Sequence, residues 1–458
     1  MKRFLILALV ASFVLAAGVA SAKEVTMQGQ FEMSWTWNDN TDFMETEESG
    51  ASEDDFTAKQ RIRQYFHYVD SENLSGTIGF EFDSVWGNTT GAPWTDDQNF
   101  ELKHGFIDFN WPGTALNIRT GLQPLTFPNA VAGSPIWDDD VAGIIASYGI
   151  NDNISVVAGW ARLLDTTQNN DAGTDTVHDE FDVFTVILPI TMDGWGLTPY
   201  VIYGQQGQGA GNAVSGLSGI NATALQDDLD VWWAGGAFTL SAFDPFNFAA
   251  DLIYGSVDGG SNGTNNDREG WFFTAIGTYT MDMVTPGIFF AYGTGEDDDP
   301  NNGSEAFPML GSCYGPTSFG FDGSNLAWTG TDHLVDGGGD ELSAMVIGGG
   351  LYGFSFLENV SHDLIVAYGV GTNDSDLTKN YEGNLGTRGF LSNGVLFNDK
   401  DSFWEVDFNT KYSLYEALTA YIEIGYISPD LDDDTHPAVD VEKLEDAWKL
   451  TVALKYMY

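Results

Sequence analysis

Cysteine, basic side chains and long apolar runs are all scarce in this chain of 458 residues, and each scarcity excludes a class of protein. The one cysteine, Cys313, excludes a disulfide framework. Only 17 Lys and Arg accompany 67 Asp and Glu, which excludes nucleic-acid binding because that binding depends on clustered cationic side chains. After residue 22, no apolar run reaches the roughly 20 residues that a membrane-spanning helix needs.

The first 22 residues have the pattern of a cleaved secretory signal peptide. Lys2 and Arg3 precede an apolar run over residues 4–17, and residues 20–22 are the small Ala-Ser-Ala that such cleavage needs. No composition break or linker divides the rest. We therefore expect export, cleavage before Lys23, and one domain over residues 23–458.

Aromatic residues and glycine are abundant. A net charge of −50 usually indicates disorder, but a 14% aromatic content supplies enough apolar surface for a folded structure. The 54 glycines and the shortage of strong helix formers favour strands and turns.

Segments of about ten residues alternate between apolar and polar side chains, which is the pattern of a transmembrane β-strand. Residues 25–37 and 448–458 show it most clearly, and the second segment ends on the aromatic Tyr458. A closed barrel is, besides the helix, the structure that satisfies every backbone group in lipid. The sequence therefore predicts an all-β, antiparallel, up-and-down transmembrane barrel.

Short turns and long acidic loops separate these segments in turn, as they do on the periplasmic and external faces of outer-membrane barrels. The count is eighteen strands. Sixteen is the alternative, because residues 181–190 and 229–240 are apolar on both faces, as subunit contacts or lumen-filling side chains would be. A soluble secreted β-sandwich also alternates, but it leaves unexplained the Trp and Tyr residues at the strand ends.

Basic residues on inward faces are the candidate pore residues, because rings of charge set selectivity in channels. Residues 123–140 carry apolar side chains between prolines, as a loop folded into the barrel would, and end in an Asp triplet. We expect that triplet to face the basic wall across a narrow opening. The candidate constriction residues are Lys59, Arg61, Arg63, Arg119, Asp138, Asp139 and Asp140.

Each half of this hypothesis has a simpler alternative. The arginines would merely neutralise acidic neighbours such as Glu32 and Glu81, and the Asp triplet would be a solvated turn.

Metal and catalytic patterns are weak. Asp258, Asn262, Gly263 and Glu269 follow part of a calcium-loop spacing, but Gly260 stands where a carboxylate is needed. Divalent cations bridging the acidic external loops fit the sequence better than one calcium site. No nucleophile, phosphate-loop or zinc pattern is present, so neither an enzyme nor a cofactor is expected.

Residues 29–43, 53–64, 106–109 and 121–124, together with the last strand, resemble the homotrimeric outer-membrane porins of sulfate-reducing bacteria. The resemblance implies a trimer of barrels in the bacterial outer membrane, each passing small hydrophilic solutes and ions. In general porins the loop after the fifth strand folds inward, and residues 123–140 occupy that position.

Two other functions remain open from the sequence. Tyr65, Tyr421 and Phe403 fall on inward faces and would suit a substrate-specific sugar or organic-acid channel. The long loops would also suit a surface adhesin with a plugged lumen.

Overall fold

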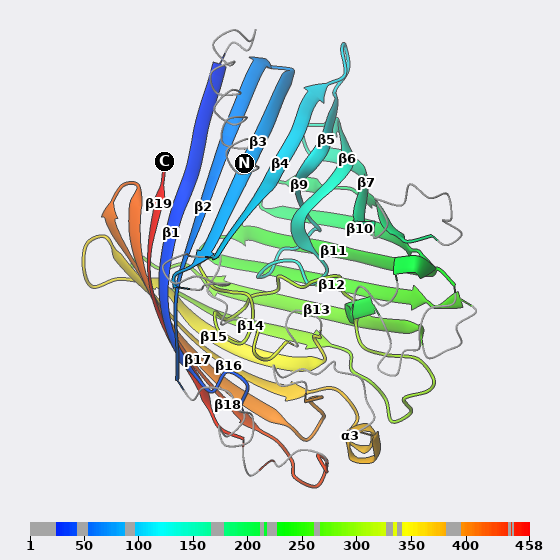
Figure 1. The fold of residues 1–458 in the computed structure, drawn as a ribbon, viewed down its shortest axis with the longest axis vertical. Coiled ribbons are helices and arrows are strands. Elements are labelled where there is room, and N and C mark those ends of the chain that lie inside the picture. The colour runs from blue at the N-terminus through cyan, green and yellow to red at the C-terminus, as the bar shows by residue number, and fades with distance from the viewer. Residues whose placement is uncertain are drawn as a thin grey trace.

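The computed structural model describes residues 24–43, 54–87, 97–165, 178–210, 215–217, 227–260, 266–326, 333–336, 341–381, 395–437, 441 and 444–458. The expected signal peptide lies outside these residues. Figure 1 shows a wall of antiparallel strands with loop segments crossing its interior.

The strands form one closed antiparallel sheet, because each pairs with its sequence neighbours and β1 also pairs with β19. The strands are β1 Glu24–Asp39, β2 Asp54–Ser71, β3 Leu74–Val85, β4 Asp97–Asn110, β5 Leu116–Thr126, β6 Asp138–Asn151, β7 Ile154–Asp165, β8 Glu180–Ile187, β9 Ile190–Met192, β10 Trp195–Gln206, β11 Leu229–Phe243, β12 Phe246–Asp258, β13 Arg268–Tyr279, β14 Thr285–Gly293, β15 Ala344–Phe354, β16 Val360–Gly371, β17 Ser402–Tyr415, β18 Leu418–Asp430 and β19 Ala447–Met457. The described parts of the loops contain three short helices: η1 Gln208–Ala210, η2 Ser215–Leu217 and α3 Ser375–Tyr381.

The wall has eighteen strands, although nineteen are labelled in the described residues, because β8 and β9 are two parts of one strand. Both pair with β10, and both also pair with β7. Pro189 stands at the interruption, where its missing N–H removes a ladder hydrogen bond. The eighteen-strand prediction is confirmed, and the irregular segment 181–190 contains this break.

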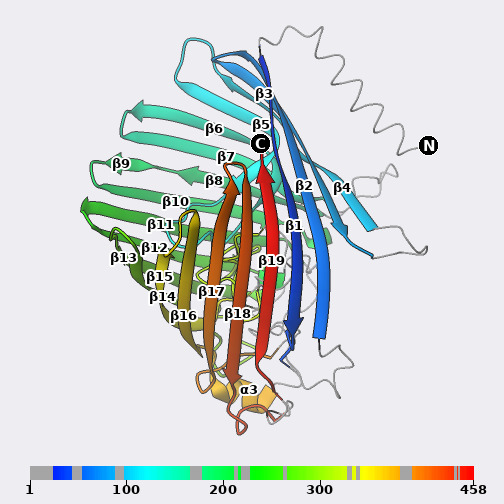
Figure 2. The same cartoon turned by 90° about the vertical axis from the view of Figure 1, so that its left-hand side faces the viewer.

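Short turns join the strands at one end of the barrel, called here the turn side, and long connections join them at the other, the loop side. The seam between β1 and β19 ends on the turn side, where Gly29 and Tyr458 each donate a backbone hydrogen bond to the other's carbonyl, at 3.0 and 3.1 Å. In Figure 2 the red strand β19 lies beside the blue strand β1.

Side chains alternate between an apolar outer face and a largely polar inner one. On β17, Trp404 and Val406 are exposed on the outside, whereas Glu405 and Asp407 are buried inside. The predicted alternation is therefore present.

Inward residues of the central strands are apolar where they pack against loops inside the barrel. Val231 and Trp233 on β11 are fully buried, and the Trp233 Nε1–H donates to the Pro308 carbonyl at 2.8 Å. This explains why residues 229–240 do not alternate cleanly: their inward side chains fill the lumen.

Among the described residues, no helix combines the length and the apolar character needed to cross a membrane.

Candidate pore constriction

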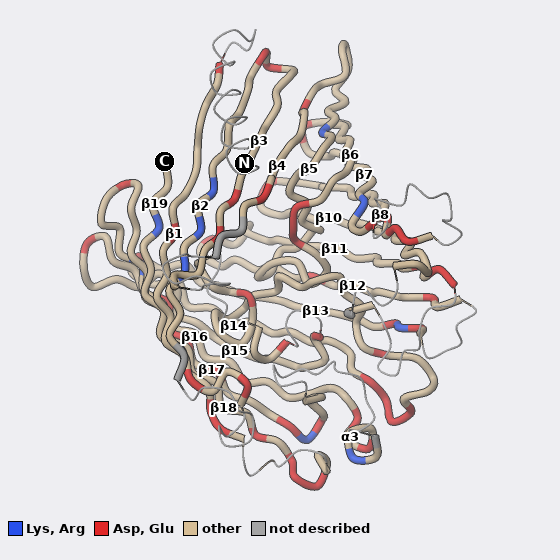
Figure 3. The backbone as a smooth tube through the Cα atoms, in the orientation of Figure 1, with Lys and Arg blue, Asp and Glu red and all other residues tan. Residues whose placement is uncertain are grey.

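The predicted basic face of β2 points into the barrel and meets acidic residues of β3. Arg61 Nη2 lies 2.6 Å from Asp83 Oδ2 and 3.2 Å from Glu81 Oε1, and Arg63 pairs with Glu81. In Figure 3, basic positions of β2 run beside acidic positions on the neighbouring strands. The register of the β2–β3 ladder causes this, since it sets Arg61 opposite Asp83 and Arg63 opposite Glu81.

Lys103 and His104 extend this network across β4, and sequence reasoning missed both. Lys103 Nζ lies 3.7 Å from Glu81 Oε2 and 2.6 Å from Asp140 Oδ2, and His104 Nε2 lies 3.0 Å from Asp140 Oδ1. The β3–β4 ladder shifts register here, with Leu102 opposite Phe80 and His104 opposite Gly79. Lys103 is thus the extra residue of a β-bulge, which re-aims its side chain inward beside His104.

Asp140 lies against β4 because the tip of the β5–β6 hairpin separates from the strands on either side of it. Pairing of β5 with β4 ends at Leu122, and pairing of β6 with β7 ends at Ala142, yet β5 and β6 stay paired as far as Thr126 and Asp138. The tip of the hairpin therefore bends away from its neighbours, and the face that carries Asp140 meets β4.

The Asp triplet, predicted to face the arginines across an opening, makes its direct ion pairs with β4. None of the described ion pairs of Asp138, Asp139 or Asp140 involves Arg61, Arg63 or Arg119, because the β4 bulge places Lys103 and His104 against Asp140 instead. Asp138 accepts a 2.5 Å hydrogen bond from the Thr126 hydroxyl, and Asp139 is exposed. The triplet begins β6, so the loop itself spans residues 127–137 and not 123–140.

Of the other two basic residues predicted for the constriction, one lies toward the loop side of this network and the other toward the turn side. Lys59 stands two residues before Arg61, nearer the loop side, opposite Ser34. Arg119 lies near the turn side, where its Nε is 2.9 Å from Asp108 Oδ2 and its guanidinium lies 4.8 Å from the centre of the Phe106 ring.

Residues 127–137, the first inward loop, lie against the inner face of β12. The backbone N–H groups of Ala130 and Val131 donate three hydrogen bonds of 2.8–3.0 Å to the buried Asp251 carboxylate. Phe127 and Ile136 are fully buried. Because Asp251 lies on the lumen face of its strand, this loop occupies the lumen.

Residues 304–326, the second inward loop, also lie inside the barrel and were not predicted to. Arg268 of β13 donates to the carbonyls of Ala306 and Phe307 at 2.9 and 2.7 Å. Backbone N–H groups of Leu310, Cys313 and Gly315 donate to carbonyls of the first inward loop. The two loops therefore form one hydrogen-bonded body.

Three wall carboxylates hold the far end of the second inward loop. Glu405 accepts hydrogen bonds from Gly320 N–H and the Thr317 hydroxyl at 2.7 and 2.8 Å. Asp407 accepts one from Ser318 N–H at 2.6 Å, and Glu423 accepts one from Asn325 N–H at 2.8 Å. A signal was present in the sequence: residues 306–321 are apolar and aromatic, unlike the acidic residues just before them.

The three inward aromatics do not line a common path. Tyr65 lies 5.1 Å, centre to centre, from the His104 ring within the charged network. Phe403 is fully buried and packs 6.5 Å from Phe321 of the second inward loop, while Tyr421 stands on β18 opposite Lys411.

The four residues of the predicted calcium loop are not all described, and the two described carboxylates accept hydrogen bonds from neighbouring groups. Asn262 and Gly263 lie outside the described residues, Asp258 accepts a hydrogen bond from Gly260 N–H at 2.8 Å, and Glu269 accepts one from the Tyr254 hydroxyl at 2.7 Å.

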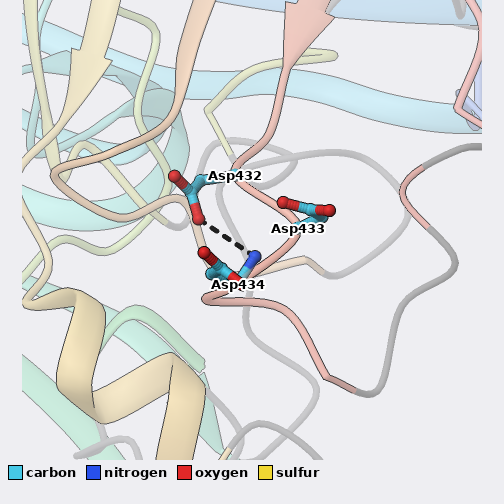
Figure 4. Close-up of side chains that lie close together, drawn as sticks. All are labelled: Asp432, Asp433 and Asp434. Carbon is cyan, nitrogen blue, oxygen red and sulfur yellow. Dashed lines mark hydrogen bonds between the residues drawn. The ribbon is translucent and has the colours of Figure 1, made fainter.

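A different acidic group appears in the loop after β18: carboxylate oxygens of Asp432, Asp433 and Asp434 lie within 4.8 Å of one another (Figure 4). Asp432 accepts the Asp434 N–H at 3.0 Å, as in an ordinary Asx turn.

No model of a known protein family matches the chain, and no curated protein matches its sequence. Solved structures do match its fold. Pseudomonas aeruginosa OccK8 (OprE) has 10% identity and a TM-score of 0.54 over 96% of this chain and 99% of that chain. Acinetobacter baumannii OccAB3 has 10% identity and a TM-score of 0.54 over 94% and 99%. The outer membrane protein OprD of P. aeruginosa has 10% identity and a TM-score of 0.51 over 96% of each chain. At this identity the likeness establishes the fold: a closed antiparallel barrel of eighteen strands.

Proposed function

We propose that the chain is a porin of the bacterial outer membrane, which passes small hydrophilic solutes and ions passively through its lumen. The observation that carries this proposal is the division of side chains across the wall. Large apolar residues such as Trp404 and Ile424 are exposed outside, where lipid would cover them. Charged residues such as Arg61, Glu81 and Lys103 line the inside, where they need water or one another.

The proposed path runs between the charged wall and the inward loops. Lys59, Arg61 and Arg63 follow one another down β2, and Arg119 lies further toward the turn side. We place the constriction at the level of Arg61, Arg63, Lys103 and Asp140, with Asp138 and Asp139 at the tip of the hairpin. A narrow opening that carries both signs of charge orders water and favours polar solutes.

A substrate-specific channel is the second candidate. The observation that favours it is the pair of loops anchored in the lumen, because they narrow the path to a fixed, polar opening. Saturable flux, or block of current by a solute, would distinguish it from free diffusion.

Planar-bilayer recording of the purified, folded protein tests the proposal. We expect stepwise current increases with a linear dependence on voltage at low voltage. A preparation shown to be folded by its heat-dependent gel mobility, yet giving no steps, would refute the porin function.

We further propose a homotrimer, which the resemblance to homotrimeric porins supports. Openings should then occur in groups of three, and the mass of the complex in detergent should equal three chains. A single-chain mass in mild detergent would contradict this.

A further inference from the structure

A cavity of about 280 Å³ lies between the two inward loops and the wall on the turn side. Its wall residues include Phe289, Tyr352 and Asp363. Tyr352 is two residues from the end of β15 and Asp363 three residues into β16, so both stand close to the short turn that joins these strands, whereas Phe289 lies midway along β14. The cavity therefore lies toward the turn side, away from the loop side, whose long acidic connections are predicted to be external.

Two glycines of β15 make room for its aromatic side chains. A Cβ at Gly348 would come within 2.2 Å of a Phe289 ring atom, and one at Gly350 within 2.3 Å of a Tyr352 ring atom. Each ring thus lies directly over a glycine. With larger residues there, the rings would be pushed into the space that is now open.

The cavity lining is apolar or neutral except for one carboxylate. Phe289, Ile365 and the Tyr352 ring are apolar, Asn325 and Asn409 are neutral, and the single charged lining residue is the half-buried Asp363. Asp363 Oδ1 accepts a 2.7 Å hydrogen bond from Gly353 N–H, and Oδ2 has no hydrogen-bond partner among the described residues. The lining contains no Lys, Arg or His.

We propose that this cavity binds a small organic cation with a ring-sized apolar body, its ammonium on Asp363 and its body against Phe289, Ile365 and Tyr352. An anion would meet an uncompensated carboxylate, and one carboxylate supplies too few ligands for a divalent metal. The volume is near the lower end of the range of about 300–1,000 Å³ for small-molecule sites, as a single-ring solute requires. This inference rests on the proposed porin function, because the lumen is the route by which the ligand reaches the cavity.

Benzylammonium, with benzyl alcohol and benzoate as neutral and anionic counterparts of similar shape, tests the assignment. Titration calorimetry on the detergent-solubilised full chain should show saturable binding of benzylammonium and none of the other two. In bilayers, benzylammonium should reduce the current of each channel relative to its own open level, and should do so at lower concentration from the turn side.

Asp363→Asn should weaken binding at least tenfold while keeping the acceptor for Gly353. Gly348→Ala should also weaken it by displacing the Phe289 ring. Glu416→Gln removes the same charge from the exposed turn between β17 and β18 and should leave binding unchanged.

Equal binding of all three probes, no binding to folded protein, or unchanged binding in Asp363→Asn would overturn the site. Calorimetry measures binding without any current, so these outcomes are separate from failure of the porin function. That failure would appear as a folded protein that gives no current steps in bilayers.

Discussion

Removing charged side chains from the inner face of the barrel should change its ion selectivity, whereas removing one from the outer face should not. Arg61 and Arg63 lie in the lumen, so replacing both with Ala removes the ion pair of Asp83 and leaves Glu81 with Lys103, 3.7 Å away. We expect the reversal potential in a salt gradient to shift toward cation preference. Arg162→Ala is a matched control: Arg162 pairs with Asp182 beside the outward Trp160, and its loss should not change selectivity. A selectivity equal to that of the parent in the double variant would assign the arginines a purely structural role.

Glu296, in the loop after β14, predicts a pH dependence of stability. Burial raises the pKa of its carboxyl to about 8, against the opposing influence of Arg268 and a 2.6 Å hydrogen bond from the Ser304 hydroxyl. Between the ordinary value of 4.5 and about 8, the folded chain binds a proton that the unfolded chain does not. Stability is therefore lost as pH rises across that range, by at most about 1.36 kcal/mol per unit of pKa difference.

The temperature at which gel mobility changes should fall from pH 6 to pH 9, and it should fall less in Glu296→Gln, whose amide stays neutral throughout. Glu416→Gln, at an exposed turn, is the control and should follow the parent. A parallel pH dependence in Glu296→Gln and the parent would contradict the prediction.

At the scale of elements, Asp251 is the anchor of the first inward loop. Its carboxylate accepts hydrogen bonds from two backbone N–H groups, that of Ala130 being shared between both oxygens, and a hydrogen bond to a charged group contributes about 1.5–3 kcal/mol for each donor. In Asp251→Ala the loop should detach from β12, and bilayer currents should become larger and noisier. Asp251→Asn keeps one acceptor oxygen and should give an intermediate result. Quiet currents of parental size in Asp251→Ala would show that other contacts hold the loop.

The sequence predicts most of the strands, because a two-residue period and turn residues are local properties. It does not predict partners that depend on register. The apolar positions change phase between Leu102 and Ile107, but the apolar Phe106 blurs the change, so the pattern does not single out Lys103 as the extra residue whose bulge brings it to Asp140. For the second inward loop, the acidic residues 295–305 look like those of the external loops and conceal the apolar stretch that follows.

At the scale of the whole molecule, closure depends on β19, which pairs with β18 on one side and β1 on the other. Removing residues 447–458 should leave two open strand edges and abolish the heat-modifiable gel form. Removing Tyr458 alone loses its ring contacts with Phe31 and Tyr456 and should only lower the transition temperature. A heat-modifiable barrel without β19 would mean that β1 and β18 can pair directly.

The reciprocal hydrogen bonds between Gly29 and Tyr458 place β1 and β19 together on the side of the barrel where other neighbouring strands are joined by turns of a few residues. A peptide bridge there, with the chain reopened at the turn between β17 and β18, would keep every strand beside its present neighbours. Such a circular permutant should assemble into the same barrel, since a ring of hydrogen-bonded strands has no inherent starting point.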